Sequence, residues 1–206
     1  MSGVMAGSGV PYYSQWESPE LAGRIIAGTM RAAEDPRWAE SGARTPQEYE
    51  YWSGRVCGLA CLKMILAGRG QPVPPMMHLV RRALFFGAYV PDGDRVTGLI
   101  YQPFADWVAR DYGITAEVAA DLSLARVAAT ASPAAPVIAS VHHSIRWPDR
   151  TPPHRGGHLV LVTGADDDHV RLHNPSGLPA TGQQDAHVKL PDFARFFAGR
   201  GVIIRG

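Results

Sequence analysis

The sequence predicts an α+β fold, with helices in the first half and an antiparallel sheet in the second. Apolar residues recur at helical spacing up to about residue 130, and short apolar runs bounded by turn residues follow from residue 136. The 206 residues are 46% hydrophobic and 19% charged, which is enough apolar material for one core. We therefore expect a single domain over residues 1–206.

The first half is expected to begin with an extended piece at residues 10–15. Thr45 and Pro46 form a good helix start, with Thr as N-cap, Pro in the first turn and Glu48 three residues after the cap. The pair Ser53-Gly54 interrupts that helix. Further helices are expected at residues 20–34, 57–67, 76–87, 100–112 and 122–131.

The second half is expected to form strands. Residues 136–141 and 158–163 predict two of them, and the unbroken apolar run of the second predicts burial on both faces. Residues 164–169 are turn-like, and residues 170–173 alternate as a return strand would. A short helix at 191–198 and a last strand at 201–205 complete the prediction.

The charge pattern limits the possible partners. Twenty basic residues face nineteen acidic ones, and no basic tail, acidic tail or long run of like charge stands out. Phosphate binding needs a clustered positive surface, so nucleic acid is not an expected partner. No signal segment and no membrane-spanning stretch is visible, so we expect a cytoplasmic protein without membrane insertion. Cys57 and Cys61 are too few for a disulfide framework.

Cys57 opens a predicted helix and is the first candidate for chemistry. A cysteine in the first turn feels the positive end of the helix dipole, which favours the nucleophilic thiolate. The small Gly58 would let a substrate carbonyl approach. The alternative is that Cys57 and Cys61 are two buried small hydrophobic residues.

His158 follows Gly156-Gly157 and opens a predicted strand, where an imidazole is well placed for proton transfer. The hairpin that follows returns to His173-Asn174-Pro175. In an antiparallel pair the start of one strand lies beside the end of the next, which brings Asn174 next to His158. An Asn side chain there could hold the imidazole in the required tautomer, as in Cys-His-Asn sites. The alternatives are a core histidine and an ordinary turn.

The ordered set of motifs resembles the bacteriocin-processing peptidases that cleave double-glycine leaders, in their stand-alone bacterial form. Cys57-Gly-Leu-Ala-Cys-Leu-Lys-Met-Ile-Leu66 is similar to their nucleophile helix. The run from Gly156 to Gly164 and the later His173-Asn-Pro-Ser-Gly177 are similar to their histidine strand and turn. The extended piece that ends at Gln15 resembles their strand with the oxyanion-hole glutamine, and residues 136–141 resemble the strand before the histidine.

The resemblance implies a papain-like fold with Cys57 as nucleophile, His158 as general base, Asn174 as the residue that orients it and Gln15 in the oxyanion hole. In the family this glutamine lies a few residues before the cysteine, so residues 16–52 are expected to be an insertion. Its tryptophans and tyrosines predict either a lid over the cleft or an added helical layer with its own aromatic core. Gln47 lies nearer to Cys57 but sits in the helix start.

The expected activity is cleavage of a peptide or amide bond through a thioester on Cys57. An acyl transferase or cyclase with the same triad, and a non-catalytic peptide-binding module, are the alternatives. Cys57, Cys61, His154 and His158 could also be spaced as zinc ligands. The prolines and glycines around the histidines make that segment a loop without a knuckle near the cysteines, so neither a metal nor a cofactor is expected.

Overall fold

The computed structural model describes residues 7–179 and 182–205. In these residues six strands form one antiparallel sheet, in the order β3-β8-β4-β5-β6-β7, and a hairpin of two further strands lies outside it. The strands are β1 (Tyr89–Asp92), β2 (Arg95–Gly98), β3 (Ala116–Ala119), β4 (Val137–Val141), β5 (His158–Ala165), β6 (His169–His173), β7 (Ala186–Lys189) and β8 (Phe197–Ile204).

Most of the helical residues precede the sheet, so the predicted α+β class is confirmed. The α-helices are α1 (Ala22–Ile26), α2 (Pro46–Ser53), α3 (Cys57–Gly68), α4 (Met76–Phe85), α5 (Tyr101–Tyr112), α6 (Leu124–Thr130) and α7 (Leu190–Phe196). The part of the chain that the structure describes also has four short 3-10 helices, η1 (Pro19–Leu21), η2 (Ala32–Glu34), η3 (Trp38–Ser41) and η4 (His143–Arg146). No helix in the described part of the chain is long and apolar enough to cross a membrane.

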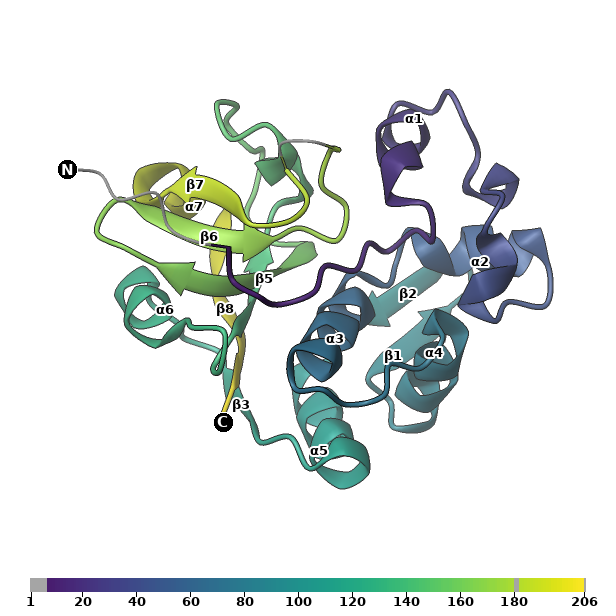
Figure 1. Cartoon of the computed structure of the whole chain (residues 1–206), viewed down its shortest axis with the longest axis horizontal. Coiled ribbons are helices and arrows are strands. Elements are labelled where there is room, and N and C mark those ends of the chain that lie inside the picture. The colour runs from purple at the N-terminus through teal and green to yellow at the C-terminus, as the bar shows by residue number, and fades with distance from the viewer. Residues whose placement is uncertain (1–6, 180–181, 206) are drawn as a thin grey trace.

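The sheet separates two hydrophobic cores, with α3 and α5 on one face and α6 and α7 on the other (Figure 1). Strand β5 contributes to both. Its residues Leu159 and Leu161 pack into the core around α3, and Val160 and Val162 pack into the core around α7. The prediction that this strand is buried on both faces is therefore confirmed. Packing on both faces holds the strand, and with it His158, its first residue, in position.

The segment at residues 16–52 forms a third, smaller core. Trp16, Ala22, Ala32 and Tyr49 are buried together, which matches the predicted helical layer with its own aromatic core. No residue of this segment lines either of the two cavities that contain Cys57. The layer thus stands beside the cleft.

The predicted helix at 20–34 is wrong in its length. Helix α1 ends at Ile26, and the chain re-enters helical geometry only in η2. Gly28 has a φ of +70°, a left-handed conformation that ends helices and that glycine adopts without strain. The missed stop signal is this glycine.

Several strands were missed or misplaced. The hairpin β1–β2, strand β3 and strand β7 were not predicted, and the last strand begins at Phe197 instead of residue 201. Strand β7 does alternate: Ala186 and Val188 are buried, and His187 and Lys189 are exposed. A pattern this short is easily read as loop. Residues 10–15, which resemble a family strand, are not a strand in the structure. The other predicted helices and strands differ from the structure by a few residues at their ends.

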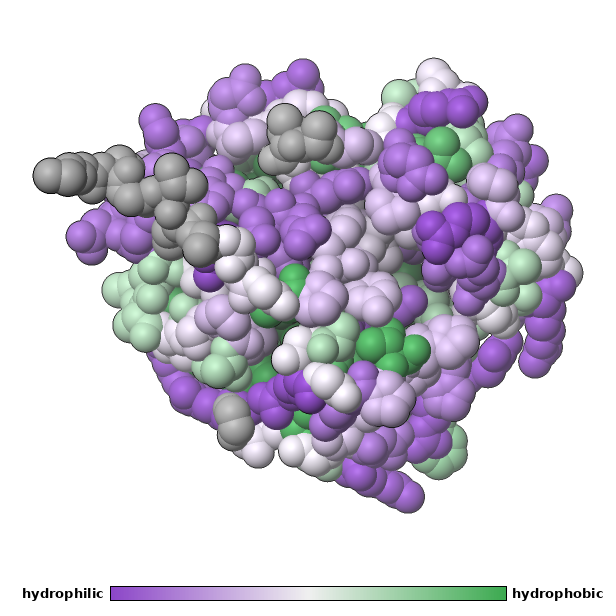
Figure 2. All heavy atoms as spheres, in the orientation of Figure 1, coloured by the Kyte–Doolittle hydropathy of each residue, from purple (hydrophilic) through white to green (hydrophobic). Residues whose placement is uncertain are grey.

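On the face shown in Figure 2, hydrophilic residues predominate and hydrophobic ones occur in small groups. Among the described residues, Phe85 and Val90 are the large hydrophobic side chains that are exposed. A binding site at Cys57 is therefore sought among the cavities and not on an exposed apolar surface.

Candidate active site

Cys57 is the first residue of α3, and it is partly exposed. The residue before it, Val56, provides no side-chain cap, so the first N–H groups of the helix are left without a side-chain acceptor. Two cavities, of about 230 and 360 Å³, are both lined by Cys57. Cys61, one turn later, is fully buried in the core. Of the two thiols, only that of Cys57 lines these cavities.

Gly58 has a different role from the one predicted. It is buried, and a Cβ at this position would lie 3.0 Å from Leu159 Cδ1 and 3.2 Å from Leu99 Cβ. The missing side chain thus allows α3 to pack closely on β5 and on the residue after β2. It does not open a path for a substrate carbonyl.

His158 and Asn174 are in contact, as predicted. His158 Nε2 lies 2.8 Å from Asn174 Oδ1, and both residues are buried. The backbone N–H of Ser176 donates to the same Asn174 atom over 3.1 Å, which identifies that atom as the amide oxygen. An oxygen only accepts, so the proton of a neutral His158 ring is on Nε2 and its Nδ1 is the basic atom.

Sheet register explains this contact. His173 pairs with Leu161, so the residues that follow β6 run back along the first residues of β5. The aspartates at 166–168 lie in the turn at the other end of the hairpin, where they cannot reach His158. Asn174 is therefore the side-chain amide that this hairpin brings to His158.

Gln15 lines the larger cavity together with Cys57 and His158, although it lies far upstream in the sequence. Its backbone N–H donates to the carbonyl of Pro175 over 2.9 Å, and Tyr12 Oη donates to the carbonyl of Asn174 over 3.0 Å. The N-terminal segment thus lies along the turn that carries Asn174, between the sheet and the helical half (Figure 1). This docking brings Gln15 to Cys57 although the two residues are far apart in the sequence.

Arg146, at the end of η4, was missed by the sequence analysis. Its Nε donates to the carbonyl of Ser176 over 2.6 Å, and its Nη2 donates to Ser176 Oγ over 2.5 Å. Ser176 Oγ in turn lies 3.1 Å from His158 Nε2. Arg146 also lines the larger cavity. No motif pointed to it; the nearest sequence signal is Ser176, inside the quoted Asn-Pro-Ser-Gly run.

The smaller cavity is lined by polar side chains besides Cys57 and His158. Tyr101, Ser140 and Arg200 line it, and burial is the main cause of the raised pKa of Tyr101, while Ser140 and Arg200 act in the opposite direction. Gly156 and Gly157, with φ of +86° and +93°, bring the chain to His158 in a conformation that suits glycine.

Burial favours the neutral forms of both reactive groups. It raises the pKa of the Cys57 thiol, although the N–H groups of Leu159, Gly58 and Cys57 and the cation of Arg146 act in the opposite direction. Burial also lowers the pKa of His158 to about 3, with Arg146 and two neighbouring histidines adding to the effect and Asn174 opposing it. The helix-start prediction of a depressed Cys57 pKa is therefore wrong, because desolvation outweighs the helix N–H groups.

At neutral pH Cys57 is therefore a thiol and His158 a neutral imidazole, and both line the same cavities. Within the described residues no hydrogen bond joins Cys57 Sγ to the His158 ring. The N–H of Leu159, the residue after His158, is instead one of the groups that act on the thiol. In ligand-free structures such catalytic contacts are often long.

Three other histidines, His142, His143 and His154, lie beside the site. His142 lies between His143 and His154, with ring centroids 4.2 and 4.5 Å apart, and its Nδ1 accepts from the N–H of Ser144. His142 thus caps η4, whereas the exposed His143 lines the larger cavity. His154 does not join the cysteines. Among the described residues, no group of three or more His, Cys, Asp or Glu is arranged to hold a metal ion.

Comparison with known proteins adds no family to this description. No family model matches the chain, and no curated protein sequence matches it.

Proposed function

We propose that the protein is a papain-like cysteine hydrolase that cleaves a peptide or amide bond, with Cys57 as nucleophile and His158 as general base. The observation that carries the proposal is the convergence of three side chains, Cys57, His158 and Gln15, on one cavity, with Asn174 Oδ1 held against His158 Nε2. These groups come from four separate stretches of the chain. A packing requirement alone gives no reason for a thiol, an imidazole and a primary amide to share a polar cavity.

The proposed reaction begins with the uncharged pair. The Cys57 side chain turns toward His158, whose Nδ1 takes the thiol proton as the sulfur attacks the substrate carbonyl. The developing oxyanion accepts hydrogen bonds from the Cys57 N–H and from the Gln15 side-chain amide, a contribution of about 3 kcal/mol for each well-placed donor. The C–N bond then breaks, and His158 returns the proton to the leaving amine.

The acyl group remains on Cys57 as a thioester until water attacks it. His158 takes a proton from that water, the acid leaves, and the thiol is restored. Asn174 acts through the ring: it holds the Nε2–H tautomer, so that Nδ1 is free to accept the proton. Arg146 favours the thiolate and disfavours the imidazolium, so its effect is to stabilise negative charge at the sulfur.

The test is the covalent intermediate. A set of activated esters and peptide amides is incubated with the protein, the reaction is quenched in acid, and intact mass and peptide mapping locate any acyl group. We expect a hydroxylamine-sensitive thioester on Cys57 that is absent in Cys57→Ala and retained in Cys61→Ala. Peptide binding without acylation would support the non-catalytic module, and transfer of the acyl group to an added amine in place of water would identify a transferase.

A further inference from the structure

The larger cavity at Cys57 has a basic lining. Arg55, His143 and Arg146 line it, and no aspartate or glutamate of the described chain does. Its volume of about 360 Å³ leaves room for a substrate group beside the thiol. A cavity with two guanidinium groups and no carboxylate has a positive potential that the surrounding low-dielectric protein strengthens.

Arg146 is held in place through two of its three guanidinium nitrogens. Its Nε and Nη2 both bond to Ser176, and within the described residues nothing accepts from Nη1. Burial lowers the pKa of Arg146 to about 10, so the side chain is a cation at neutral pH, and a negative charge on Cys57 would stabilise that cation. A partly buried guanidinium without a carboxylate partner gains from an anion that arrives with the substrate.

Arg55 is held just as firmly, and again by neutral groups. Its guanidinium lies 4.4 Å from the centroid of the Tyr51 ring and donates to the backbone carbonyls of Tyr51 and Asp94. No carboxylate of the described chain forms an ion pair with Arg55 or Arg146. By contrast, Arg31, Arg37 and Arg82 each pair with an acidic side chain. Backbone carbonyls and a ring orient Arg55 while leaving its charge unneutralised.

We propose that Arg146 and Arg55 form a carboxylate-binding subsite, so that the enzyme acts on peptides or amides with a carboxylate next to the bond that is cleaved. The inference rests on the hydrolase function proposed above and narrows its substrate class. The carboxylate is either an acidic side chain or the end of a peptide, since both present the same two oxygens to a guanidinium.

A pair of small alkylating reagents tests the subsite without knowledge of the substrate. Iodoacetate and iodoacetamide form the same kind of S–CH2 bond and release iodide, but only iodoacetate carries a carboxylate. We expect the ratio of their rate constants at Cys57 to exceed the ratio for a free small thiol by about tenfold, the preference that one charge-assisted contact supports. The ratio should fall as salt is added.

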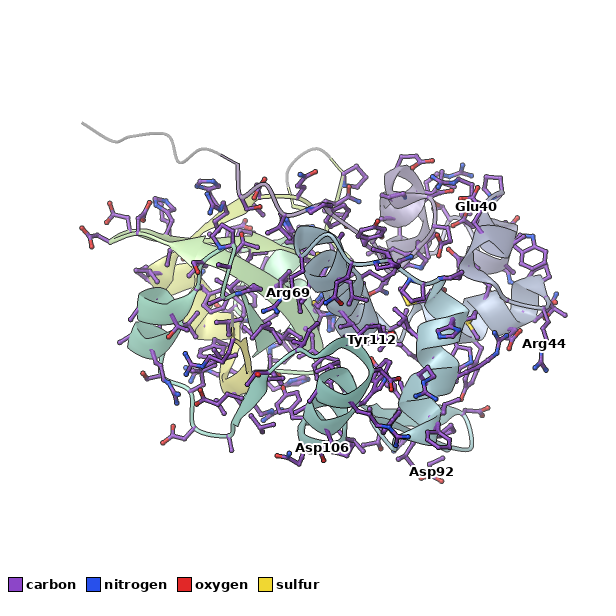
Figure 3. All side chains as sticks on the ribbon, turned by 60° about the horizontal axis from the view of Figure 1, so that its bottom comes forward. Glu40, Arg44, Arg69, Asp92, Asp106 and Tyr112 are labelled. Atoms are coloured by element: carbon purple, nitrogen blue, oxygen red, sulfur yellow. The ribbon has the colours of Figure 1, made fainter. Side chains whose placement is uncertain are left out.

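Variants of Arg55 and Arg146 test whether these residues cause the preference for iodoacetate. Arg55→Gln, Arg146→Gln and the double variant should lower the ratio toward that of the free thiol. A change in the Cys57 pKa affects both reagents alike, so the ratio isolates the recognition of the carboxylate. Arg44→Gln is the matched control, because Arg44 is exposed at the outer rim of the helical half (Figure 3). Circular dichroism reports whether each variant is folded, and Arg→Lys variants replace any that is not.

Two outcomes would overturn the subsite: a ratio equal to that of the free thiol, or a raised ratio that the double variant retains. Paired peptides then separate the two sources of the carboxylate, with Glu against Gln beside the scissile bond and with a free against an amidated C-terminus. If the iodoacetate preference is present but no peptide or ester acylates Cys57, the hydrolase proposal fails while the anion subsite stands.

Discussion

At the scale of single residues, Asn174 acts through one atom. Its Oδ1 accepts from His158 Nε2 and from the N–H of Ser176. A carboxylate oxygen accepts the same two bonds, whereas an alanine accepts neither. What the site requires at this position is an acceptor, and the amide nitrogen of Asn174 has no partner among the described side chains.

The need for an acceptor predicts the order of activity of the Asn174 variants. We expect Asn174→Asp to keep an activity close to wild type and Asn174→Ala to lose about tenfold or more, because the ring is then free to adopt the other tautomer. Cys57→Ala should be at background. Acylation rates of Cys57 by an activated ester give the comparison. An Asn174→Ala rate equal to wild type, with His158→Ala inactive, would show that another group orients the ring.

The two thiols are expected to differ sharply in reactivity. Cys57 lines two cavities, whereas Cys61 is fully buried and burial raises its pKa well above the ordinary value. Iodoacetamide should therefore alkylate Cys57 first, with peptide mapping by mass spectrometry as the readout. Cys57→Ser should abolish rapid labelling and Cys61→Ser should preserve it. Preferential labelling of Cys61 would reverse the assignment.

The pH dependence of that labelling follows from the raised pKa of Cys57. Thiolate is scarce below the raised pKa, so the rate should still be rising with pH above about 8.5, the ordinary value for a cysteine. Arg146→Gln removes a cation that lowers the Cys57 pKa and should move the profile to higher pH. A rate that is already level at pH 6 would instead indicate a thiolate–imidazolium pair.

At the scale of elements, the layer formed by residues 16–52 depends on a buried carboxylate. Asp35 is fully buried and accepts bonds from Ser18 Oγ and Tyr49 Oη, both over 2.6 Å, and from the N–H groups of Ser18 and Arg37. Tyr49 belongs to α2, and Ser18 precedes η1. The carboxylate therefore ties the start of the layer to its last helix.

Loss of this carboxylate should destabilise the layer. Asp35→Ala leaves several buried donors without an acceptor, and we expect the free energy of unfolding to fall by about 3 kcal/mol. Asp92→Ala is the matched control, because Asp92 is exposed at the rim of the hairpin (Figure 3), and it should change stability by less than about 0.5 kcal/mol. Urea denaturation followed by circular dichroism measures both.

The same residue makes stability depend on pH. Burial alone would raise the pKa of Asp35, but the bonds from Ser18, Tyr49 and Arg37 lower it below its ordinary value. A lowered folded-state pKa contributes stability above the unfolded pKa of about 3.9, and this contribution is lost as pH falls through the folded value. The stability difference between wild type and Asp35→Asn should therefore shrink below about pH 4.

At the scale of the whole molecule, the sheet that separates the two cores depends on a close backbone approach between β4 and β8. A Cβ at Gly201 would lie 2.2 Å from the carbonyl oxygen of Ile138, which is far inside van der Waals contact. The pairing of Gly201 with Ala139 stands next to an irregularity in the register of β4 and β8. Backbone atoms cannot move aside as a flexible side chain can.

Gly201→Ala should therefore destabilise the entire molecule, by about 3 kcal/mol or more. Gly23→Ala serves as the control, because its Cβ would meet only Pro179 Cδ, at 3.9 Å, and alanine favours the helix in which it lies. Thermal unfolding should show a lower Tm for the first variant and an equal or higher Tm for the second. A Gly201→Ala protein as stable as wild type would mean that β4 and β8 lie further apart.

The sequence by itself determined the class of the fold and the contact between His158 and Asn174. Periodicity and turn residues carry that information locally, and antiparallel pairing places the two ends of a hairpin side by side. It also indicated Gln15, but only through a resemblance, because nothing local connects residue 15 to residue 57. The missed helix break at Gly28 and the missed short strands lie where one residue outweighs the surrounding pattern.

Only the tertiary structure decided the electrostatics of the site. Docking of the N-terminal segment on Pro175 places Gln15 in the cavity, and the packing of η4 on Ser176 brings Arg146 to it. Desolvation by burial raises the pKa of Cys57, against the direction that its position at a helix start predicts. Burial and long-range proximity depend on how all the elements pack together, and no short stretch of sequence contains them.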